Sequence, residues 1–229
     1  MKINNKIIAL VFTSALVACN NAPETAVEAS DAQEVKTETA EAAMYTVNTG
    51  SDEVVWEGYK TFALGDAHTG TIQVSEGNFM VEGDQLVGGS FIIDMTSINN
   101  ADLAESPEYK AKLEGHLKSA DFFAVDSFPT AKFEITSAEA VAAGDSTGAT
   151  HNVSGNLTLR GITKNVTIPA MVEMTDAGIN FATPEFVIDR SKWNVKFRST
   201  SFSEFADIAK DNIIDNNIKL SVKLMASKA

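Results

Sequence analysis

Apolar and polar residues alternate along most of the chain after residue 44, with the two-residue period of a half-buried β-strand. The alternation is clearest at residues 218–225, where aliphatic side chains occupy every second position. Residues 153–159 and 166–172 show the same alternation on either side of a turn-like segment at residues 160–164. The pattern therefore predicts an antiparallel hairpin over residues 153–172 and a further strand near the end of the chain.

Weaker alternation predicts six more strands, separated in many places by short polar turns such as residues 81–84 and 176–178. Strands joined mainly by hairpins are typical of an all-β antiparallel barrel or sandwich. The additional predicted strands are Glu53–Lys60, Thr71–Ser75, Leu86–Met95, Thr130–Ser137, Ile179–Ile188 and Val195–Phe202.

One segment has helical periodicity. Ser106 followed by Pro107 is typical of a helix start, because proline is well tolerated at the first helical position. Tyr109, Leu113 and Leu117 then fall on one stripe at a spacing of four residues. The spacing predicts a single helix of about three turns inserted between strands. A second short helical turn near residues 205–211 has a weaker signal.

The N-terminal residues 1–18 have the features of an export signal. Lys2 and Lys6 precede an apolar stretch at residues 7–16 that is too short to span a bilayer. Leu16-Val17-Ala18-Cys19 then resembles the bacterial lipobox, which implies cleavage before Cys19 and acylation of that cysteine with diacylglycerol and a fatty acid such as palmitate. The alternative is an ordinary secretory signal that contains a cysteine.

Several acyl chains on Cys19 would anchor the protein stably, where a single chain binds only marginally. We therefore expect a lipid anchor in the cell envelope, with the protein facing the periplasm. Asn20, directly after Cys19, favours the outer membrane.

Residues 19–43 differ in composition from the rest of the chain. They are rich in alanine, threonine and acidic residues and contain no aromatic residue. Such a segment buries too little apolar area to offset its ordering entropy, which predicts a disordered acidic tether. An isolated helix is the alternative. Residues 44–229 form the predicted globular domain.

Composition excludes several classes of function. The formal net charge of -13 argues against non-specific binding of nucleic acid, which needs clustered lysine and arginine. One cysteine excludes a disulfide scaffold and a site with several thiolates. The three histidines lack partners at metal-ligand spacing, and no nucleophile-elbow, P-loop or dinucleotide-binding motif occurs. We therefore predict no metal, no cofactor, no catalytic residues and no enzymatic activity.

Three blocks of sequence resemble the YceI-like family of lipid- and polyisoprenoid-binding proteins. The first covers residues 116–123 and 128–133, the second residues 155–164 and the third residues 188–194, where Asn194 replaces a commoner glycine. Residues 55–60 and 65–72 resemble a subgroup of that family. The resemblance implies an eight-stranded, antiparallel, lipocalin-like barrel with one inserted helix, whose interior holds a long isoprenoid or similar amphiphile.

Strand alternation then predicts which side chains point into the barrel. The alternative is that the same side chains fill a closed core. A shift of one residue in the phase of a strand would exchange its inner and outer faces. The twelve predicted ligand-binding residues are Trp56, Phe79, Phe91, Ile93, Phe133, Ile135, Leu157, Leu159, Val166, Ile168, Phe181 and Phe186.

The predicted function is a membrane-tethered carrier or sequestering protein for an isoprenoid or other long-chain amphiphile, with a homodimer left open. Two alternatives remain at this stage. One is an interaction protein with a filled barrel and no lipid ligand. The other is a hydrolase or isomerase acting on a bound lipid, which predicts titratable groups converging inside the barrel.

Overall fold

The computed structural model describes residues 26–35, 42–50, 53–62, 67–142, 147–175 and 177–229. The predicted export signal and Cys19 lie outside the described residues, so the lipid anchor stays a prediction. No helix within the described ranges is long and apolar enough to cross a membrane.

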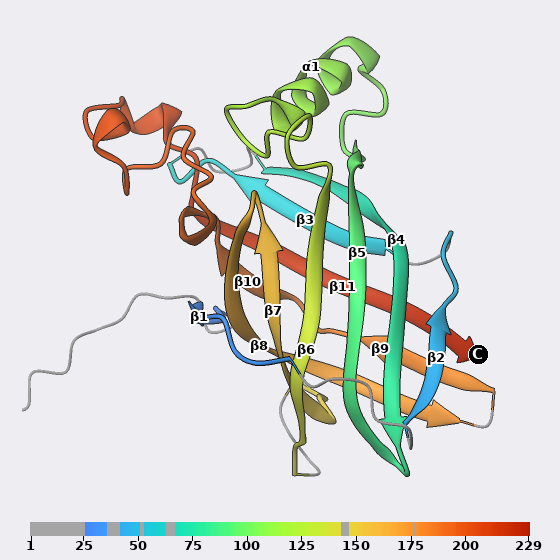
Figure 1. Ribbon diagram of the computed structural model, residues 1–229. Coiled ribbons are helices and arrows are strands. Elements are labelled where there is room, and N and C mark those ends of the chain that lie inside the picture. The colour runs from blue at the N-terminus through green and yellow to red at the C-terminus, as the bar shows by residue number, and fades with distance from the viewer. Residues whose placement is uncertain (1–25, 36–41, 51–52, 63–66, 143–146, 176) are drawn as a thin grey trace, which may run out of the picture.

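The described chain is mainly antiparallel sheet, as the alternation predicted (Figure 1). Its strands are β1 (Ser30–Asp31), β2 (Ala43–Val47), β3 (Glu53–Tyr59), β4 (Ala67–Glu82), β5 (Gln85–Asn100), β6 (Thr130–Ala140), β7 (His151–Leu159), β8 (Ile162–Thr175), β9 (Gly178–Ala182), β10 (Phe186–Asp189) and β11 (Asn217–Lys228).

Eight of these strands close into a ring. The pairing runs from β3 through β4, β5, β6, β7 and β8 to β9, then to β11 and back to β3. β2 and β10 add further pairings to β11. The predicted eight-stranded antiparallel barrel is therefore confirmed. Closure matters because it leaves few strand edges unpaired.

Alternation along the strands places apolar side chains inside the ring. On β8, Val166, Ile168 and Ala170 are buried, whereas Thr167 between them is exposed. Strand pairing puts residues of equal phase on one face of the sheet, so the apolar face of each strand faces the interior. The hydrophobic core is built mainly from these inward positions.

The predicted helix is also confirmed. Helix α1 (Pro107–Lys118) begins after Ser106 and lies over one end of the barrel (Figure 1). Leu113 and Leu117 face the barrel, but Tyr109 is 68% exposed. The four-residue spacing therefore identifies the helix, but only two of the three residues on the stripe line the cavity.

One strand prediction was wrong in part, and another was wrong altogether. Residues 179–188 form two strands, β9 and β10, separated by a segment that contains Pro184 and therefore lacks one backbone donor. Residues 195–202 form no strand. They belong to a loop that continues through two short 3-10 helices, η2 (Ser203–Phe205) and η3 (Lys210–Asn212), near the predicted second helical turn. β2 and the second half of β4 were not predicted.

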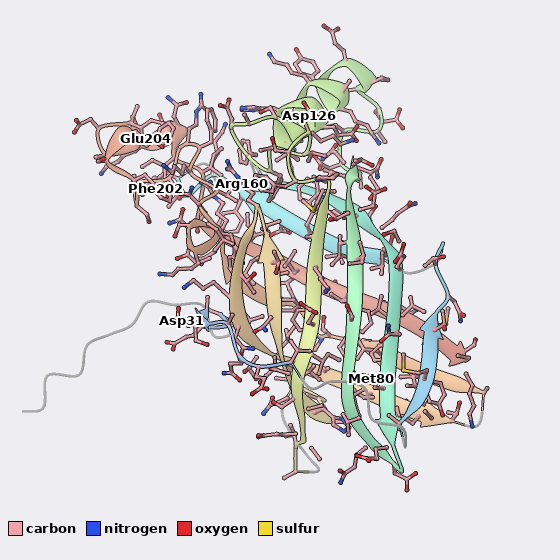
Figure 2. The ribbon with its side chains drawn as sticks, in the orientation of Figure 1. Asp31, Met80, Asp126, Arg160, Phe202 and Glu204 are labelled. Carbon is pink, nitrogen blue, oxygen red and sulfur yellow. The ribbon has the colours of Figure 1, made fainter. Side chains whose placement is uncertain are left out.

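The disordered tether predicted for residues 19–43 is also wrong for residues 26–35. Ala26 forms an isolated bridge with Val187, and Ser30 and Asp31 pair with β8 as strand β1. Figure 2 shows Asp31 beside the barrel wall. The segment gains backbone hydrogen bonds to strand edges far along the chain, which its local composition does not reveal.

A buried arginine fixes the loop after β10. Arg190, 1% exposed, begins the 3-10 helix η1 (Arg190–Trp193). Its guanidinium group donates to four backbone carbonyl oxygens: Val195 at 2.7 Å, Phe197 at 2.9 Å, and Ile214 and Asp215 at 3.0 Å. Burial lowers the pKa of Arg190 to about 10, partly offset by the charges of Asp189 and Asp215.

Replacing Arg190 with methionine should destabilise the protein by about 3 kcal/mol or more, because four buried or partly buried carbonyl groups lose their donor. Chemical denaturation measures the loss. Lys192→Met is the matched control: this side chain is 54% exposed and should contribute less than about 1 kcal/mol. Equal stabilities of the two variants would contradict the role given to Arg190.

Candidate functional site

The barrel encloses a cavity with a volume of about 630 Å³. Inward side chains of the barrel strands and of β10 line it, and Leu113, Leu117, Phe197 and Ile214 line the end beneath α1 and the loop after β10. This volume is in the range of small-molecule sites, which are concave and mostly apolar. The interior is therefore not completely filled by its own side chains.

Two glycines help to keep the centre of the barrel open. A Cβ atom on Gly155 would collide with the ring of Phe133, and one on Gly70 would collide with the ring of Trp56. Both rings line the cavity and lie directly against these glycines on neighbouring strands. Bare backbone at the two positions lets the rings lie along the wall, which leaves more of the centre empty.

Ten of the twelve predicted residues line the cavity; whether they contact a ligand stays a prediction. The two that do not are Phe79 and Ile135, both completely buried. Phe79 packs against Phe91 and Phe181, with ring centroids 4.9 and 5.5 Å apart. The ten that line it are Trp56, Phe91, Ile93, Phe133, Leu157, Leu159, Val166, Ile168, Phe181 and Phe186.

Phe79 and Ile135 lie on the inward face of their strands, as predicted, but at a position along the barrel axis that the cavity does not reach. They pair with Gly89 and Gly155, well along β5 and β7 from the ends of the strands near α1. Strand alternation reveals the face on which a residue lies, whereas its height in the barrel depends on the register of all strands.

The aromatic run after α1 both lines the cavity and packs against the helix. Phe122 and Phe123 line the cavity. Phe122 also packs against His116 and Phe197, with ring centroids 5.0 and 5.3 Å apart, and so joins α1 to the loop after β10. Phe128 instead lies against Gly161 in the turn between β7 and β8.

Basic side chains are concentrated in the cavity lining, although the protein is acidic overall. The lining contains no aspartate or glutamate from the described parts of the chain. The basic residues of the lining and one tyrosine come from five separate segments of the chain, so the sequence analysis assigned them no role. These residues are Tyr59, Lys60, His68, Lys112, His116, Arg190 and Arg198.

Arg198 has an unusual backbone conformation at this site. Its φ angle is 53°, a value uncommon for a residue other than glycine. Its guanidinium carbon lies 5.2 Å from the centre of the Phe197 ring, within the range of a cation–π contact. Such backbone strain is concentrated at functional sites, which directs attention to Arg198.

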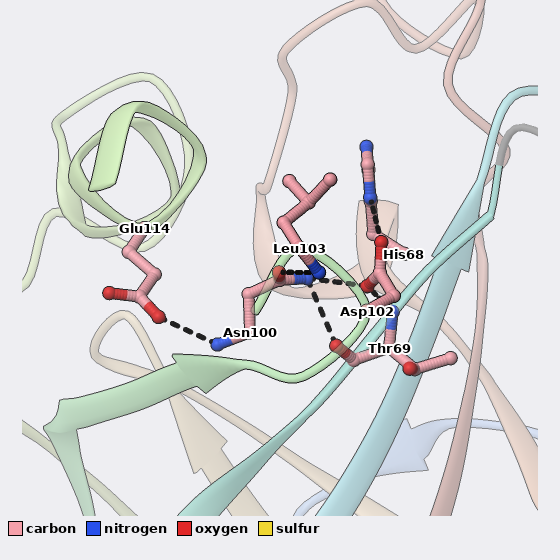
Figure 3. Close-up of polar contacts among 6 residues, drawn as sticks. All are labelled: His68, Thr69, Asn100, Asp102, Leu103 and Glu114. Carbon is pink, nitrogen blue, oxygen red and sulfur yellow. Dashed lines mark hydrogen bonds and ion pairs between the residues drawn. The ribbon is translucent and has the colours of Figure 1, made fainter. Parts of the chain in front are cut away.

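A hydrogen-bond network positions His68 at the cavity wall (Figure 3). Its Nδ1 atom lies 2.9 Å from Oδ2 of Asp102. The other carboxylate oxygen of Asp102 accepts hydrogen bonds from the Thr69 amide at 2.8 Å and from the Asn100 side chain at 2.6 Å. The backbone amide of Asn100 donates to the Glu114 carboxylate on α1 at 2.7 Å, so the network joins the helix to β4 and β5.

Opposing effects act on the pKa of Asp102. Burial raises the pKa, but the hydrogen bonds from His68, Thr69 and Asn100 favour the ionised form and together lower it below the ordinary value. Asp102 is therefore held as a carboxylate that orients His68. Within the ranges that the structure describes, no group of three or more His, Cys, Asp or Glu side chains is placed to hold a metal ion.

Comparison with protein families gives one match over most of the chain. The family model of the YceI-like domain matches residues 45–226. The chain is also 50% identical over 60 residues to a UPF0312 protein of Pseudomonas aeruginosa strain LESB58, a match covering 26% of this chain and 28% of that protein. It is 33% identical over 101 residues to a UPF0312 protein of Pseudomonas putida strain F1, covering 44% and 47%. The chain thus spans less than half the length of these relatives.

Two solved structures share the fold. BcnA of Burkholderia cenocepacia is 21% identical, with a TM-score of 0.53 over 77% of this chain and 96% of that one. A polyisoprenoid binding domain from Saccharophagus degradans, implicated in plant cell wall breakdown, is 12% identical, with a TM-score of 0.54 over 81% and 98%. At these identities the comparison shows the barrel architecture alone.

Proposed function

Because the chain belongs to the YceI-like domain family, we propose that it binds a polyisoprenoid or similar long-chain amphiphile inside its barrel. The observation that carries this proposal is the apolar cavity of about 630 Å³. The neighbour from Saccharophagus degradans is a polyisoprenoid binding domain, which supports the same class of ligand.

The energetics of burial suit an apolar chain in this cavity. Burying one CH2 group contributes about 0.8 kcal/mol, so an isoprene unit of five carbons contributes roughly 3–4 kcal/mol before ordering costs. A few buried units are enough for useful affinity. Wall residues such as Ile168, Phe186 and Leu157 provide contacts along the cavity.

The basic lining suits a polar and preferably anionic head group at the end of the cavity beneath α1. Lys112 lies on α1, and Arg198 lies on the loop that follows β10. The structure gives neither of them an ion pair with a described carboxylate. A phosphate or carboxylate head near these residues would gain charge-assisted hydrogen bonds while its tail enters the apolar part of the cavity.

The proposal includes a membrane tether. The lipobox-like residues 16–19 support acylation of Cys19, attachment to the cell envelope and a position facing the periplasm, with Asn20 favouring the outer membrane. A tethered barrel would carry an amphiphile to or from a membrane, or sequester it there. Assembly into a homodimer stays a prediction.

The two alternative functions receive less support. A filled barrel conflicts with the observed cavity. A hydrolase or isomerase requires titratable groups converging on a lipid, and the cavity does contain His68, His116 and basic residues. The matched family is nevertheless one of binding proteins, which supports the prediction that this chain is not an enzyme.

Filling the cavity should weaken ligand binding without unfolding the protein. Ile168→Trp places a large ring in the lining, whereas Thr167→Trp places the same ring on the exposed face of the same strand. We expect Ile168→Trp to bind geranylgeraniol at least about tenfold more weakly than the wild type, a loss of about 1.4 kcal/mol. Thr167→Trp should bind normally. Equilibrium binding of radiolabelled geranylgeraniol measures both.

Thermal unfolding followed by circular dichroism verifies that both variants are folded. A folded Ile168→Trp variant that binds as tightly as the wild type would show that the ligand lies elsewhere.

The head-group proposal predicts a preference for anionic ligands. The wild type should bind geranylgeranyl phosphate about tenfold more tightly than geranylgeraniol at low salt, because charge-assisted hydrogen bonds are stronger than neutral ones. Arg198→Gln and Lys112→Gln should each reduce this preference. Lys132→Gln, at an outer lysine paired with Glu134 at 2.7 Å, is the control. Equal affinities for phosphate and alcohol would refute the head-group assignment and leave tail binding intact.

A further inference from the structure

The barrel wall has a gap between β8 and β10. β9 pairs with β8 only at residues 171–175, so the earlier part of β8 continues without a partner from β9 or β10 on that side. β10 pairs with β11 along its other edge. No described strand other than the N-terminal segment joins the two edges.

Residues 26–31 occupy this gap and bond to both edges. On the β10 side, Ala26 forms a parallel bridge with Val187, and the Val27 amide donates to the Val187 carbonyl oxygen at 2.9 Å. On the β8 side, Ser30 and Asp31 of β1 pair with Asn165 and Lys164. The segment is thus a short wall strand, contributed by a part of the chain more than 100 residues away from the strands it joins.

Two buried asparagines extend the site that receives this segment. The backbone N–H of Gln33 donates to Oδ1 of Asn156 at 2.9 Å, and Nδ2 of Asn156 donates to the backbone carbonyl oxygen of Gln33 at 2.7 Å. Asn165 in turn donates to Asn156 at 3.0 Å and to Thr136 at 3.1 Å. Asn156 and Asn165 are only 5% and 3% exposed. The Asn156 amide therefore pairs with the segment as a neighbouring strand would.

The gap lies against the ligand cavity. Val166 and Ile168 on β8, and Phe186 and Ile188 on β10, flank the gap and line the cavity. Val27 in the N-terminal segment packs half-buried against the hydrophobic core. Removing the segment would therefore leave a lateral opening between the cavity and the outside of the barrel.

The segment is held more weakly than the other wall strands. β1 has two residues, and its ion pair between Asp31 and Lys164, at 2.9 Å, involves an Asp31 side chain that is 98% exposed. Exposed ion pairs contribute about 0–1 kcal/mol. Segments with few buried contacts and short ladders open at a lower free energy than the core of a fold.

We propose that residues 26–35 form a detachable wall strand that closes a lateral portal to the cavity. This inference rests on the proposed lipid-binding function. An amphiphile enters and leaves sideways when the segment detaches, with its tail passing between β8 and β10. Ala26 follows Cys19 by seven residues, which span at most about 25 Å, so an acylated Cys19 would keep the portal near the membrane surface.

A reversible disulfide tests this portal directly. The chain carries Cys19→Ser, Asp31→Cys and Lys164→Cys, so that the two cross-strand neighbours form the engineered pair. Directly opposed residues of antiparallel strands have the Cα separation that a disulfide needs. The measurement is the rate at which preloaded geranylgeraniol leaves the oxidised and the reduced protein for an excess of acceptor vesicles.

The expected result is release about tenfold slower, or more, in the oxidised form, with the wild-type rate restored by dithiothreitol. The control is a second engineered disulfide, Glu139→Cys with Asn152→Cys, between exposed positions that pair on β6 and β7. This variant should release geranylgeraniol at the same rate when oxidised and when reduced. Asn156→Ala should release faster than the wild type. Asn152→Ala, at an exposed outer position of the same strand, should not.

Three results would overturn the proposal. Failure of the Asp31–Lys164 thiol pair to oxidise would contradict the docked position of the segment. Equal release rates in the oxidised and reduced proteins would show that ligands leave by another route, while the lipid-binding function would stand. Absence of geranylgeraniol binding in every variant would remove the proposed function and the portal together.

Discussion

The width of an eight-stranded ring is the constraint on which the rest of this structure depends. A ring of this size is just wide enough for side chains to fill or for one small ligand to occupy. Here the rings of Trp56 and Phe133 lie along the wall against glycines, and the centre stays open. An apolar cavity that the chain does not fill loses dispersion contacts that an alkyl tail would restore. The same geometry that closes the sheet therefore creates the cavity in which we propose that a lipid binds.

Two polar networks fix the end of the barrel near α1. Arg190 holds the loop between β10 and β11 together through four backbone carbonyl groups, and the Asp102 network joins α1 to β4 and β5. In both networks a charged side chain bonds to backbone groups, which makes the geometry specific. The N-terminal segment differs, because it is short and largely exposed, and this contrast makes it the part of the wall best suited to move.

The sequence predicts the local elements well where a local pattern decides them. Alternation in residues 153–172 identifies the hairpin of β7 and β8, and Ser106-Pro107 marks the start of α1. Prediction from the sequence fails where contacts with residues far along the chain determine the local structure. Residues 195–202 alternate like a strand, but Arg190 draws their carbonyl groups into a loop. The buried side-chain amide of Asn156 bonds to the backbone of Gln33, 123 residues away in the sequence. Composition alone therefore does not reveal that residues 26–35 are ordered.

The site residues could also be predicted only in part. The inward face of the strands was predicted correctly, but Phe79 does not line the cavity, because its position along the barrel axis depends on the register of all strands. The basic residues converge from β4, α1, the loop after β10 and the position directly after β3, so no linear motif unites them. Native mass spectrometry of the protein, isolated from bacterial membranes without added lipid, tests the central claim most directly. The account predicts a bound mass that matches a long-chain amphiphile recovered in the lipid extract. Protein that carries no such ligand, and takes up no polyprenyl lipid at micromolar concentration, would contradict it.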